Sequence, residues 1–148
     1  DAPSALTRLM ELGVPSYLLN ATILGVLAQR LVRTLCPACR QPAEAAPTQL
    51  LAEAVKPWRI NSGSYKPYAP VGCVECRMTG YRGRMGIYEL LTVSDTFRAL
   101  VHEGAALTAL RKQAVADGMR PLRLAGALRA CEGVTTLAEA ISATPPLT

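Results

Sequence analysis

The chain has 148 residues, of which 50% are hydrophobic but only 5% are aromatic, and its formal net charge is +5. This length suits one domain or two small ones, and the composition predicts an aliphatic, alanine-rich core that favours helices. No run of residues approaches the roughly 18 apolar residues of a membrane-spanning helix. The chain starts at Asp1 without a methionine or a signal-peptide pattern, so we expect a fragment of a longer protein. The positive charge permits acidic partners, nucleotides or lipid headgroups and selects none of them.

Two helices and a strand are predicted before the first cysteine. A helical apolar face occupies residues 4–12, and Gly13 is a plausible stop. Pro15 suits the first turn of a second helix that continues to Ile23. Residues 26–33 alternate in part, as a strand does, so helix and strand are expected to pack in one α/β layer.

The middle of the chain, residues 36–80, is rich in proline and contains four paired cysteines. Only residues 49–55 look helical there, which predicts loops held together by something other than a hydrophobic core. Residues 85–91 then predict a strand in which Ile87 and Leu91 share a face.

From Ser94 onward the sequence predicts helices separated by glycines. The first helix is capped by Ser94 and ends near Gly104, and the second has an apolar stripe of Leu107, Leu110 and Ala114 and ends at Gly118. The third helix starts at Pro121 and stops at Gly133. The last one starts with a capping box from Thr136 to Glu139. Together with the strands, these helices predict a mixed α/β (α+β) fold.

The four paired cysteines predict a metal site. Cys36 and Cys39 form one Cys-x-x-Cys pair, and Cys73 and Cys76 form a second pair 33 residues later. Two intervening residues let the chain turn so that both sulfurs of a pair face one ion, and two such turns complete a tetrahedron. Pro37 would preorganise the first turn, and Gly80 would give room after the second. We therefore expect a structural Zn²⁺ with four protein ligands and no open position for catalysis.

Other chemistry is possible for these cysteines. A redox dithiol would need a βαβ setting, whereas these pairs lie among prolines. Structural disulfides are disfavoured in a cytosolic chain, and iron–sulfur ligation by four cysteines is chemically possible. Cys131 lies in a helical segment and is interpreted as an ordinary buried cysteine.

The chain carries no sign of catalysis of its own. It contains no GxxxxGK[ST] phosphate-binding loop, and His102 is its only histidine. We therefore expect that it is not an enzyme as an isolated fragment. A zinc-stabilised nucleic-acid-binding module is the alternative function, although the gap between the cysteine pairs exceeds that of a zinc ribbon and aromatic residues for base stacking are lacking.

The combined motifs resemble the C-terminal region of the traffic ATPases of type II secretion and type IV pilus assembly. The matching segments are residues 24–33 leading into the first cysteine pair, Thr79–Gly80–Tyr81–Arg82–Gly83–Arg84 with the following strand, Gly118–Met119, and Gly133–Val134–Thr135–Thr136–Leu137 with Glu139. The resemblance covers nearly the whole chain and includes both the secretion and the pilus branches.

The resemblance implies a division of the chain and a setting for it. Residues 1–35 would be the terminal elements of a RecA-like ATPase domain, residues 36–80 a tetracysteine zinc insertion, and residues 81–148 a strand with a C-terminal helical subdomain. The parent would be a hexameric cytoplasmic ATPase, peripheral at a bacterial inner membrane, that binds ATP and Mg²⁺ outside this chain. Its partners would be neighbouring subunits, an inner-membrane platform protein and a cytoplasmic adaptor, with nucleic acid disfavoured.

The resemblance also suggests roles for individual residues. The four paired cysteines match the zinc ligands of the family. Arg84 matches an arginine of the family's GYxGR segment, for which nucleotide or subunit contacts are implied, and Gln29 and Arg30 match its QRL strand. These three residues are candidates for a nucleotide site or a subunit interface. For Gln29 and Arg30 a structural role is the first interpretation, and for Arg84 the alternative is a solvated group or one that balances the thiolate charge.

Overall fold

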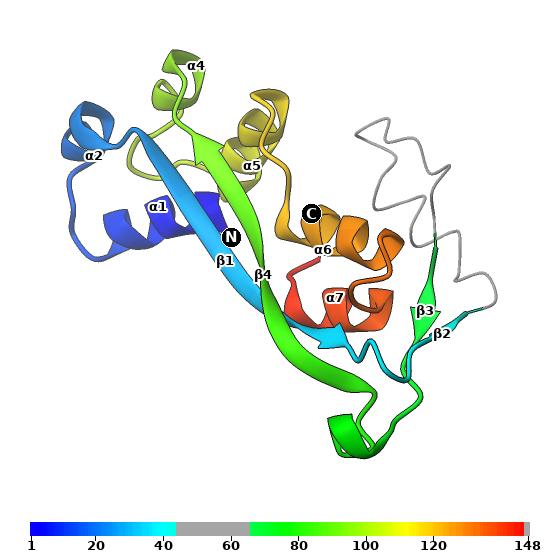
Figure 1. Ribbon diagram of the computed structural model, residues 1–148. Helices are drawn as coiled ribbons and strands as arrows, with labels where there is room; N and C mark the ends of the chain where they lie inside the picture. The colour runs from blue at the N-terminus through cyan, green and yellow to red at the C-terminus, as the bar shows by residue number, and fades with distance from the viewer. Residues whose placement is uncertain (44–65, 147–148) are drawn as a thin grey trace. The chain divides into compact units, whose positions relative to one another are not determined.

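The protein is a mixed helix-and-strand chain, which confirms the predicted α+β class. The computed structural model describes residues 1–43 and 66–146 (Figure 1). The helix predicted over residues 49–55 lies outside these described residues. None of the helices in the described ranges is long and apolar enough to cross a membrane.

The chain divides into two compact units. The first unit contains residues 1–29 and 88–121, and the second contains the described residues of 30–87 and 122–147. Each of the two long strands, β1 (Gly25–Leu35) and β4 (Tyr81–Thr92), contributes one part to each unit.

The strands β1 and β4 pair in an antiparallel two-stranded sheet (Figure 1). The Val93 amide donates to the Leu24 carbonyl at one end (3.0 Å), and the Cys36 amide donates to the Gly80 carbonyl at the other (2.9 Å). This pairing joins two segments that are separated by the whole cysteine-containing region. Both predicted strands are therefore present, and each is longer than its apolar pattern suggested.

The helices of the first unit begin and end close to their predicted positions. They are α1 (Ala2–Glu11), α2 (Ser16–Thr22), α4 (Asp95–Arg98) and α5 (Leu107–Ala116). Asp1 caps α1 by accepting the Ser4 amide at 2.9 Å, while the Ser4 hydroxyl donates to the Asp1 carbonyl at 2.8 Å. Pro15 lies at the N-cap of α2, just outside the first turn that the sequence predicted for it.

The core of the first unit is aliphatic and contains small side chains. Its buried members are Ala2, Leu6, Leu19, Leu91, Phe97, Val101, Leu110, Ala114 and Met119. Phe97, the single phenylalanine of the chain, is fully buried. The predicted α5 stripe is confirmed because Leu110 and Ala114 are both buried, with Leu107 partly so.

The helix predicted from Ser94 to about Gly104 is wrong in its length. Ser94 does cap it, accepting the Phe97 amide at 3.0 Å, but α4 ends after one turn at Arg98. The Val101 carbonyl accepts the Asn20 side chain at 3.0 Å, so that carbonyl bonds to a distant helix. The Arg98 guanidinium also donates to the Asn20 carbonyl. These bonds to Asn20 of α2 compete with the hydrogen bonds that a longer α4 would need. They join residues far apart in the sequence, so a local pattern cannot predict them.

The buried face of β4 contains a carboxylate that the sequence analysis did not anticipate. Ile87, Glu89 and Leu91 alternate along the strand and are 1%, 2% and 0% exposed, which confirms that Ile87 and Leu91 share a face. Within the first unit, Glu89 accepts the Ala2 amide at the start of α1 at 2.6 Å. A carboxylate at a helix N-terminus is favourable because unpaired amides and the helix dipole meet it there.

The second unit surrounds the cysteines with short elements and two helices. They are β2 (Gln41–Pro42), β3 (Tyr68–Ala69), the 3₁₀ turn η2 (Val74–Cys76), α6 (Leu122–Cys131) and α7 (Leu137–Ala143). The helices α6 and α7 approach closely at Gly126, where an added Cβ would lie 2.9 Å from the Cβ of Ala140. Pro121 directly precedes α6 and Gly133 follows it, as predicted.

The predicted capping box of α7 is only half formed. The Thr136 hydroxyl accepts the Glu139 amide at 3.1 Å, which is the expected cap. The Glu139 carboxylate faces Arg33 instead of turning back to the Thr136 backbone. The Glu139 carboxylate therefore accepts hydrogen bonds from Arg33 of β1, where the capping box predicted a bond from the Thr136 amide.

Candidate metal centre

The first cysteine pair forms a tight turn directly after β1. The Cys39 and Arg40 amides donate to the Cys36 carbonyl at 3.3 and 2.9 Å. Cys36 is buried, and its own amide is bonded to the Gly80 carbonyl. The turn thus directs two sulfurs inward while its backbone is tied to the segment that follows the second pair.

The second cysteine pair forms a turn of the same kind around η2. The Cys76 amide donates to the Cys73 carbonyl at 3.2 Å, and the Met78 amide donates to the same carbonyl at 2.8 Å. The Thr79 hydroxyl donates to the Cys76 carbonyl at 2.6 Å. Gly80 has a φ of +75°, and a Cβ there would lie 2.4 Å from the Cβ of Pro70. The predicted need for glycine after the second pair is therefore confirmed.

The four sulfurs form one cluster in which all lie within 4.8 Å of one another. The Sγ–Sγ distances are 3.9 Å for Cys36–Cys73, 3.8 Å for Cys39–Cys76 and 3.7 Å for Cys73–Cys76. Four thiolates at about 2.3 Å from one ion form a tetrahedron with edges of about 3.8 Å. The cluster therefore has the dimensions of a single four-thiolate ion site, and all four cysteines are free of disulfides.

Backbone amides point at the sulfurs. Gly72 N–H donates to Cys39 Sγ at 3.3 Å, and the amides of Cys73 and Gly80 each donate to Cys76 Sγ at 3.2 Å. Burial raises the pKa of the Cys76 thiol, but these two amides and the bonds from Cys73 and Cys39 outweigh it and lower the pKa to about 6. Burial dominates at Cys39 and raises its pKa to about 11. The protein thus stabilises negative charge on the sulfur that receives two amide bonds.

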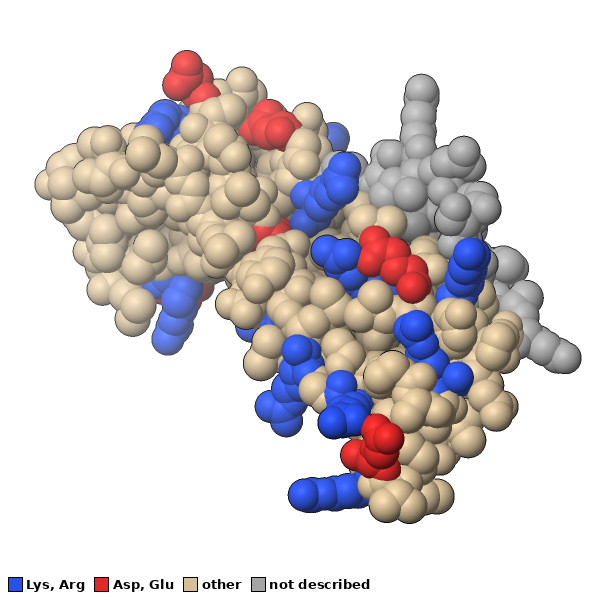
Figure 2. Space-filling model, viewed as in Figure 1, with Lys and Arg blue, Asp and Glu red and all other residues tan. Residues whose placement is uncertain are grey.

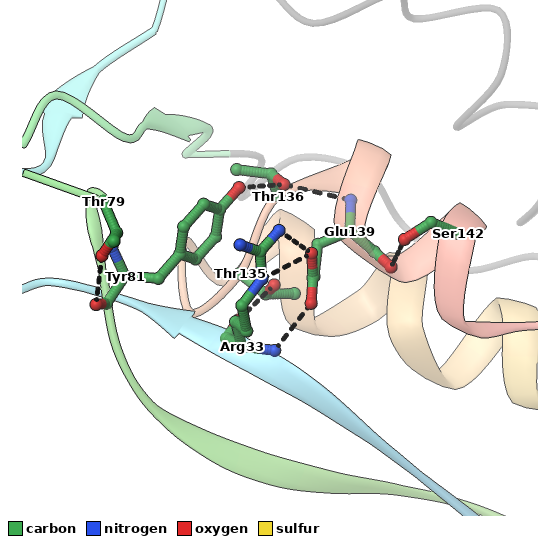
Figure 3. Close-up of polar contacts among 7 residues, drawn as sticks. All are labelled: Arg33, Thr79, Tyr81, Thr135, Thr136, Glu139 and Ser142. Atoms are coloured by element: carbon green, nitrogen blue, oxygen red, sulfur yellow. Dashed lines mark hydrogen bonds and ion pairs between the residues drawn. The ribbon is translucent and has the colours of Figure 1, made fainter.

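An ion-pair network lies on the strand that leads into the first cysteine pair (Figure 3). Glu139 of α7 accepts the Arg33 amide at 3.0 Å and its guanidinium at 3.0 and 2.6 Å. The guanidinium also lies 4.2 Å from the centre of the Tyr81 ring, and the Tyr81 hydroxyl is 3.0 Å from the Thr136 hydroxyl. Thr135 donates to the Arg33 carbonyl at 2.7 Å. These contacts fix the end of β1 against the start of α7.

The network shifts the ionisation of both charged partners. Hydrogen bonds from Arg33 hold the pKa of the Glu139 carboxyl below its usual value despite burial, and the positive charge of Arg84 contributes. The same hydrogen bond raises the pKa of Arg33. Both groups are therefore charged near neutral pH. Sequence analysis missed this pair because the two residues are 106 positions apart.

The other candidate residues are exposed strand positions. Gln29 lies on the β1 segment of the first unit, while Arg30 and Arg84 lie on β1 and β4 in the second. Arg84 is close enough to influence Glu139 electrostatically. The structure brings the four cysteines together, whereas none of these three residues lines the cleft of about 340 Å³ in the first unit. That cleft is lined by Tyr88, Leu90, Thr92, Asp117, Gly118, Met119 and Arg120.

Comparison with known proteins supports the resemblance seen in the sequence. Residues 1–142 match the family described as type II/IV secretion system protein. The chain is 44% identical to the type IV pilus assembly ATPase TfpB of Acinetobacter baylyi, with 98% of this chain and 24% of that protein aligned. It is 42% identical to the type IV pilus assembly ATPase PilB of Myxococcus xanthus, with 99% and 26% aligned.

A relative from the secretion branch is similar to the same degree. The type II secretion system protein HxcR of Pseudomonas aeruginosa is 43% identical, with 97% of this chain and 26% of that protein aligned. The chain thus spans about a quarter of the length of these relatives. The predicted family is confirmed: the chain belongs to the type II/IV secretion system protein family, whose members include the secretion and pilus-assembly ATPases.

Proposed function

We propose that this chain is the non-catalytic, zinc-binding C-terminal region of a hexameric ATPase that powers type II protein secretion or type IV pilus assembly. The observation that carries the proposal is a four-sulfur cluster of single-ion dimensions in a chain aligned over nearly its whole length with such ATPases. Both branches are represented among relatives of about equal identity, so the proposal covers both.

In this proposal the chain divides as its motifs suggest. Residues 1–35 complete a RecA-like ATPase domain, residues 36–80 form the zinc module, and residues 81–148 supply a strand and a helical subdomain. ATP and Mg²⁺ bind to the parent protein outside this chain. Arg84, Gln29 and Arg30 are exposed, as groups that meet a nucleotide or a neighbouring subunit would be.

The cluster suits a single zinc ion better than an iron–sulfur cluster. Three sulfur–sulfur distances of 3.7 to 3.9 Å, in a cluster whose sulfurs all lie within 4.8 Å of one another, agree with a four-thiolate zinc site. An iron–sulfur cluster contains several iron and sulfide atoms between the thiolates and so requires wider spacing. Four protein ligands leave no open position, so the ion would stabilise the fold and would not catalyse.

The proposed setting follows from the family. The parent ATPase would act in the cytoplasm at the inner membrane, with neighbouring subunits, a platform protein and a cytoplasmic adaptor as partners. The proteins aligned with this chain are named as secretion and pilus-assembly components, which supports a role in such machinery.

Elemental analysis of protein purified under reducing conditions, without added metal, tests the metal assignment. We expect one zinc and no iron per chain. Cys76→Ser should lower zinc retention against a competing chelator, while Cys131→Ser, outside the cluster, should leave it unchanged. Iron in place of zinc, or four reactive thiols with no metal, would contradict the assignment.

Two further assays test the functional class with the same protein. The chain alone should show no magnesium-dependent ATP hydrolysis above background, while the full-length parent should hydrolyse ATP. A nucleic-acid module would instead bind oligonucleotides with an affinity that falls steeply as salt is raised. ATP turnover by the chain alone would contradict the non-catalytic role, and salt-sensitive oligonucleotide binding would favour the rival.

A further inference from the structure

The positive charge of the chain is concentrated in the second unit. Its described residues include nine arginines and lysines but three glutamates, whereas those of the first unit include five cations and six carboxylates. Figure 2 shows many Lys and Arg side chains on the surface of the elements that surround the cysteines. All but one of the nine cations are arginines. A surface of this kind attracts negatively charged partners.

The turn around the second cysteine pair carries exposed apolar side chains. Val71, Val74 and Met78 are 53%, 90% and 70% exposed. All three belong to one tight turn, because the backbone of Gly72 approaches that of Met78 (a Cβ on Gly72 would lie 2.8 Å from the Met78 carbonyl oxygen) and η2 begins between them at Val74. We call the surface formed by these three residues with Glu75, Arg77 and Arg82 the knuckle tip.

The backbone of the knuckle tip holds these side chains outward. Arg77 and Met78 have φ angles of 54° and 61°, in the left-handed region that glycine and asparagine occupy most easily. The sulfurs of Cys73 and Cys76 occupy the inner side of the turn. Large side chains at two such positions do not help the turn to form and are exposed to water, so folding alone does not account for them.

The charged residues of the knuckle tip include a cation, Arg77, that pairs with no carboxylate among the described residues. Arg82 pairs with Glu75 at 2.6 Å, and both side chains are 59% exposed. Arg77 is exposed and forms no ion pair with the residues that the structure describes. The tip therefore presents three apolar side chains beside a guanidinium that pairs with no carboxylate in the described part of the chain.

We propose that the knuckle tip is a docking surface for an acidic protein segment that carries apolar side chains. A guanidinium fork matches a carboxylate in a bidentate manner, and the aliphatic side chains offer area that a partner would remove from water. A protein segment suits the tip better than a lipid surface, because the tip has no aromatic side chain, the type that favours the membrane interface.

The test uses the full-length protein that contains this chain and a fluorescent 12-residue peptide of alternating glutamate and leucine. Binding is measured by fluorescence polarisation at low and at moderate salt. Arg77→Glu and Val74→Ser should each weaken binding at least tenfold. Matched changes in the first unit, Lys112→Glu and Leu12→Ser, should change it less than twofold. Leu12 is 66% exposed and Lys112 is also exposed, so each control alters a surface position.

Three outcomes would overturn the proposal. Equal losses in the tip and control variants would mean that any change of surface charge weakens binding. If a peptide of alternating glutamate and serine bound with the same affinity as the glutamate–leucine peptide, apolar side chains would not contribute to binding. Tip-dependent binding to vesicles of phosphatidylglycerol and phosphatidylcholine, without peptide binding, would identify a lipid surface instead. Metal content and circular dichroism of every variant check the fold, and Val74→Ser is the decisive variant if Arg77→Glu loses metal.

Discussion

The ion pair between Arg33 and Glu139 should stabilise the protein more than the pair between Arg82 and Glu75. The closest N–O distance is 2.6 Å in both, and both join an arginine to a glutamate. They differ in exposure, because the Glu139 side chain is only 11% exposed whereas both side chains of the second pair are 59% exposed. The second pair is thus an exposed control with the same residue types and the same closest distance.

The magnitude follows from the contacts and their exposure. Exposed ion pairs contribute about 0–1 kcal/mol, and hydrogen bonds to charged groups contribute roughly 1.5–3 kcal/mol. Glu139 accepts two such bonds from the Arg33 guanidinium, but Arg33 is 51% exposed, so water screens part of the interaction; the third bond, from the Arg33 amide, remains in Arg33→Ala. We expect a coupling energy of about 1–1.5 kcal/mol for Arg33–Glu139 and below about 0.5 kcal/mol for Arg82–Glu75.

Double-mutant cycles to alanine measure both couplings. Each cycle compares the free energy of urea unfolding, followed by circular dichroism, in the two single variants and the double variant. Arg33→Ala should cost more than Glu139→Ala, because it leaves a carboxylate without its cation at a site that is 11% exposed, whereas Arg33 alone can be hydrated.

The coupling should also depend on pH in a defined direction. Hydrogen bonds from Arg33 lower the pKa of Glu139 from 4.5, so this carboxyl stabilises the folded state above that value. The contribution is lost as the pH falls through the lower folded-state pKa. Arg33 stays protonated throughout this pH range, so protonation of Glu139 alone ends the pairing of the two charges. Equal couplings in the two cycles, or an Arg33–Glu139 coupling that persists at pH 2, would refute the reasoning.

Three further predictions concern close packing and the metal. Gly80→Ala should lose metal and stability, because the added Cβ would lie 2.4 Å from the Cβ of Pro70. In the control Gly13→Ala the added Cβ would have no atom within 4 Å, so thermal unfolding should show a loss of only about 1 kcal/mol. Gly126→Ala should destabilise by about 1 kcal/mol in urea, because overlap with Ala140 at 2.9 Å exceeds the gain in helix propensity; a stabilised variant would contradict this. Removing the metal with a chelator should speed amide hydrogen exchange in α6 and α7 more than in α1 and α5, and uniform acceleration would argue against a local role.

Features with a local physical cause could be predicted from the sequence. The two-residue spacing of each cysteine pair is set by how a short turn aims its sulfurs, and the cluster formed as that spacing predicted. Gly13 and Gly133 have positive φ angles just after helices, where the predicted stops lay. The alternation that joins Ile87 and Leu91 follows from the strand period of two. In each case the cause lies within a few residues.

Features that depend on distant partners could not be predicted in this way. The buried Glu89 carboxylate is bonded to an amide 87 positions away, and its sequence context is that of an ordinary strand. Thr136 and Glu139 match a capping box, yet the carboxylate binds Arg33 because a charged donor outcompetes a backbone amide. Likewise, the Asn20 bond to the Val101 carbonyl competes with continuation of the helix predicted to reach Gly104. A local pattern thus predicts which caps and helix ends are possible, and tertiary contacts determine which of them form.

Hydrogen bonds connect the cysteine turns to several other elements of the second unit. The Leu35 amide donates to the Val134 carbonyl at 2.9 Å, and the Arg40 guanidinium donates to the Gly133 carbonyl at 2.7 Å, so both flanks of the first pair hold the turn between α6 and α7. The Cys36 amide holds the start of β4 through the Gly80 carbonyl. An ion that fixes the cysteine turns would therefore fix β1, β4 and the α6–α7 turn together. None of the four cysteines belongs to the core of the first unit, so that core should not depend on the ion.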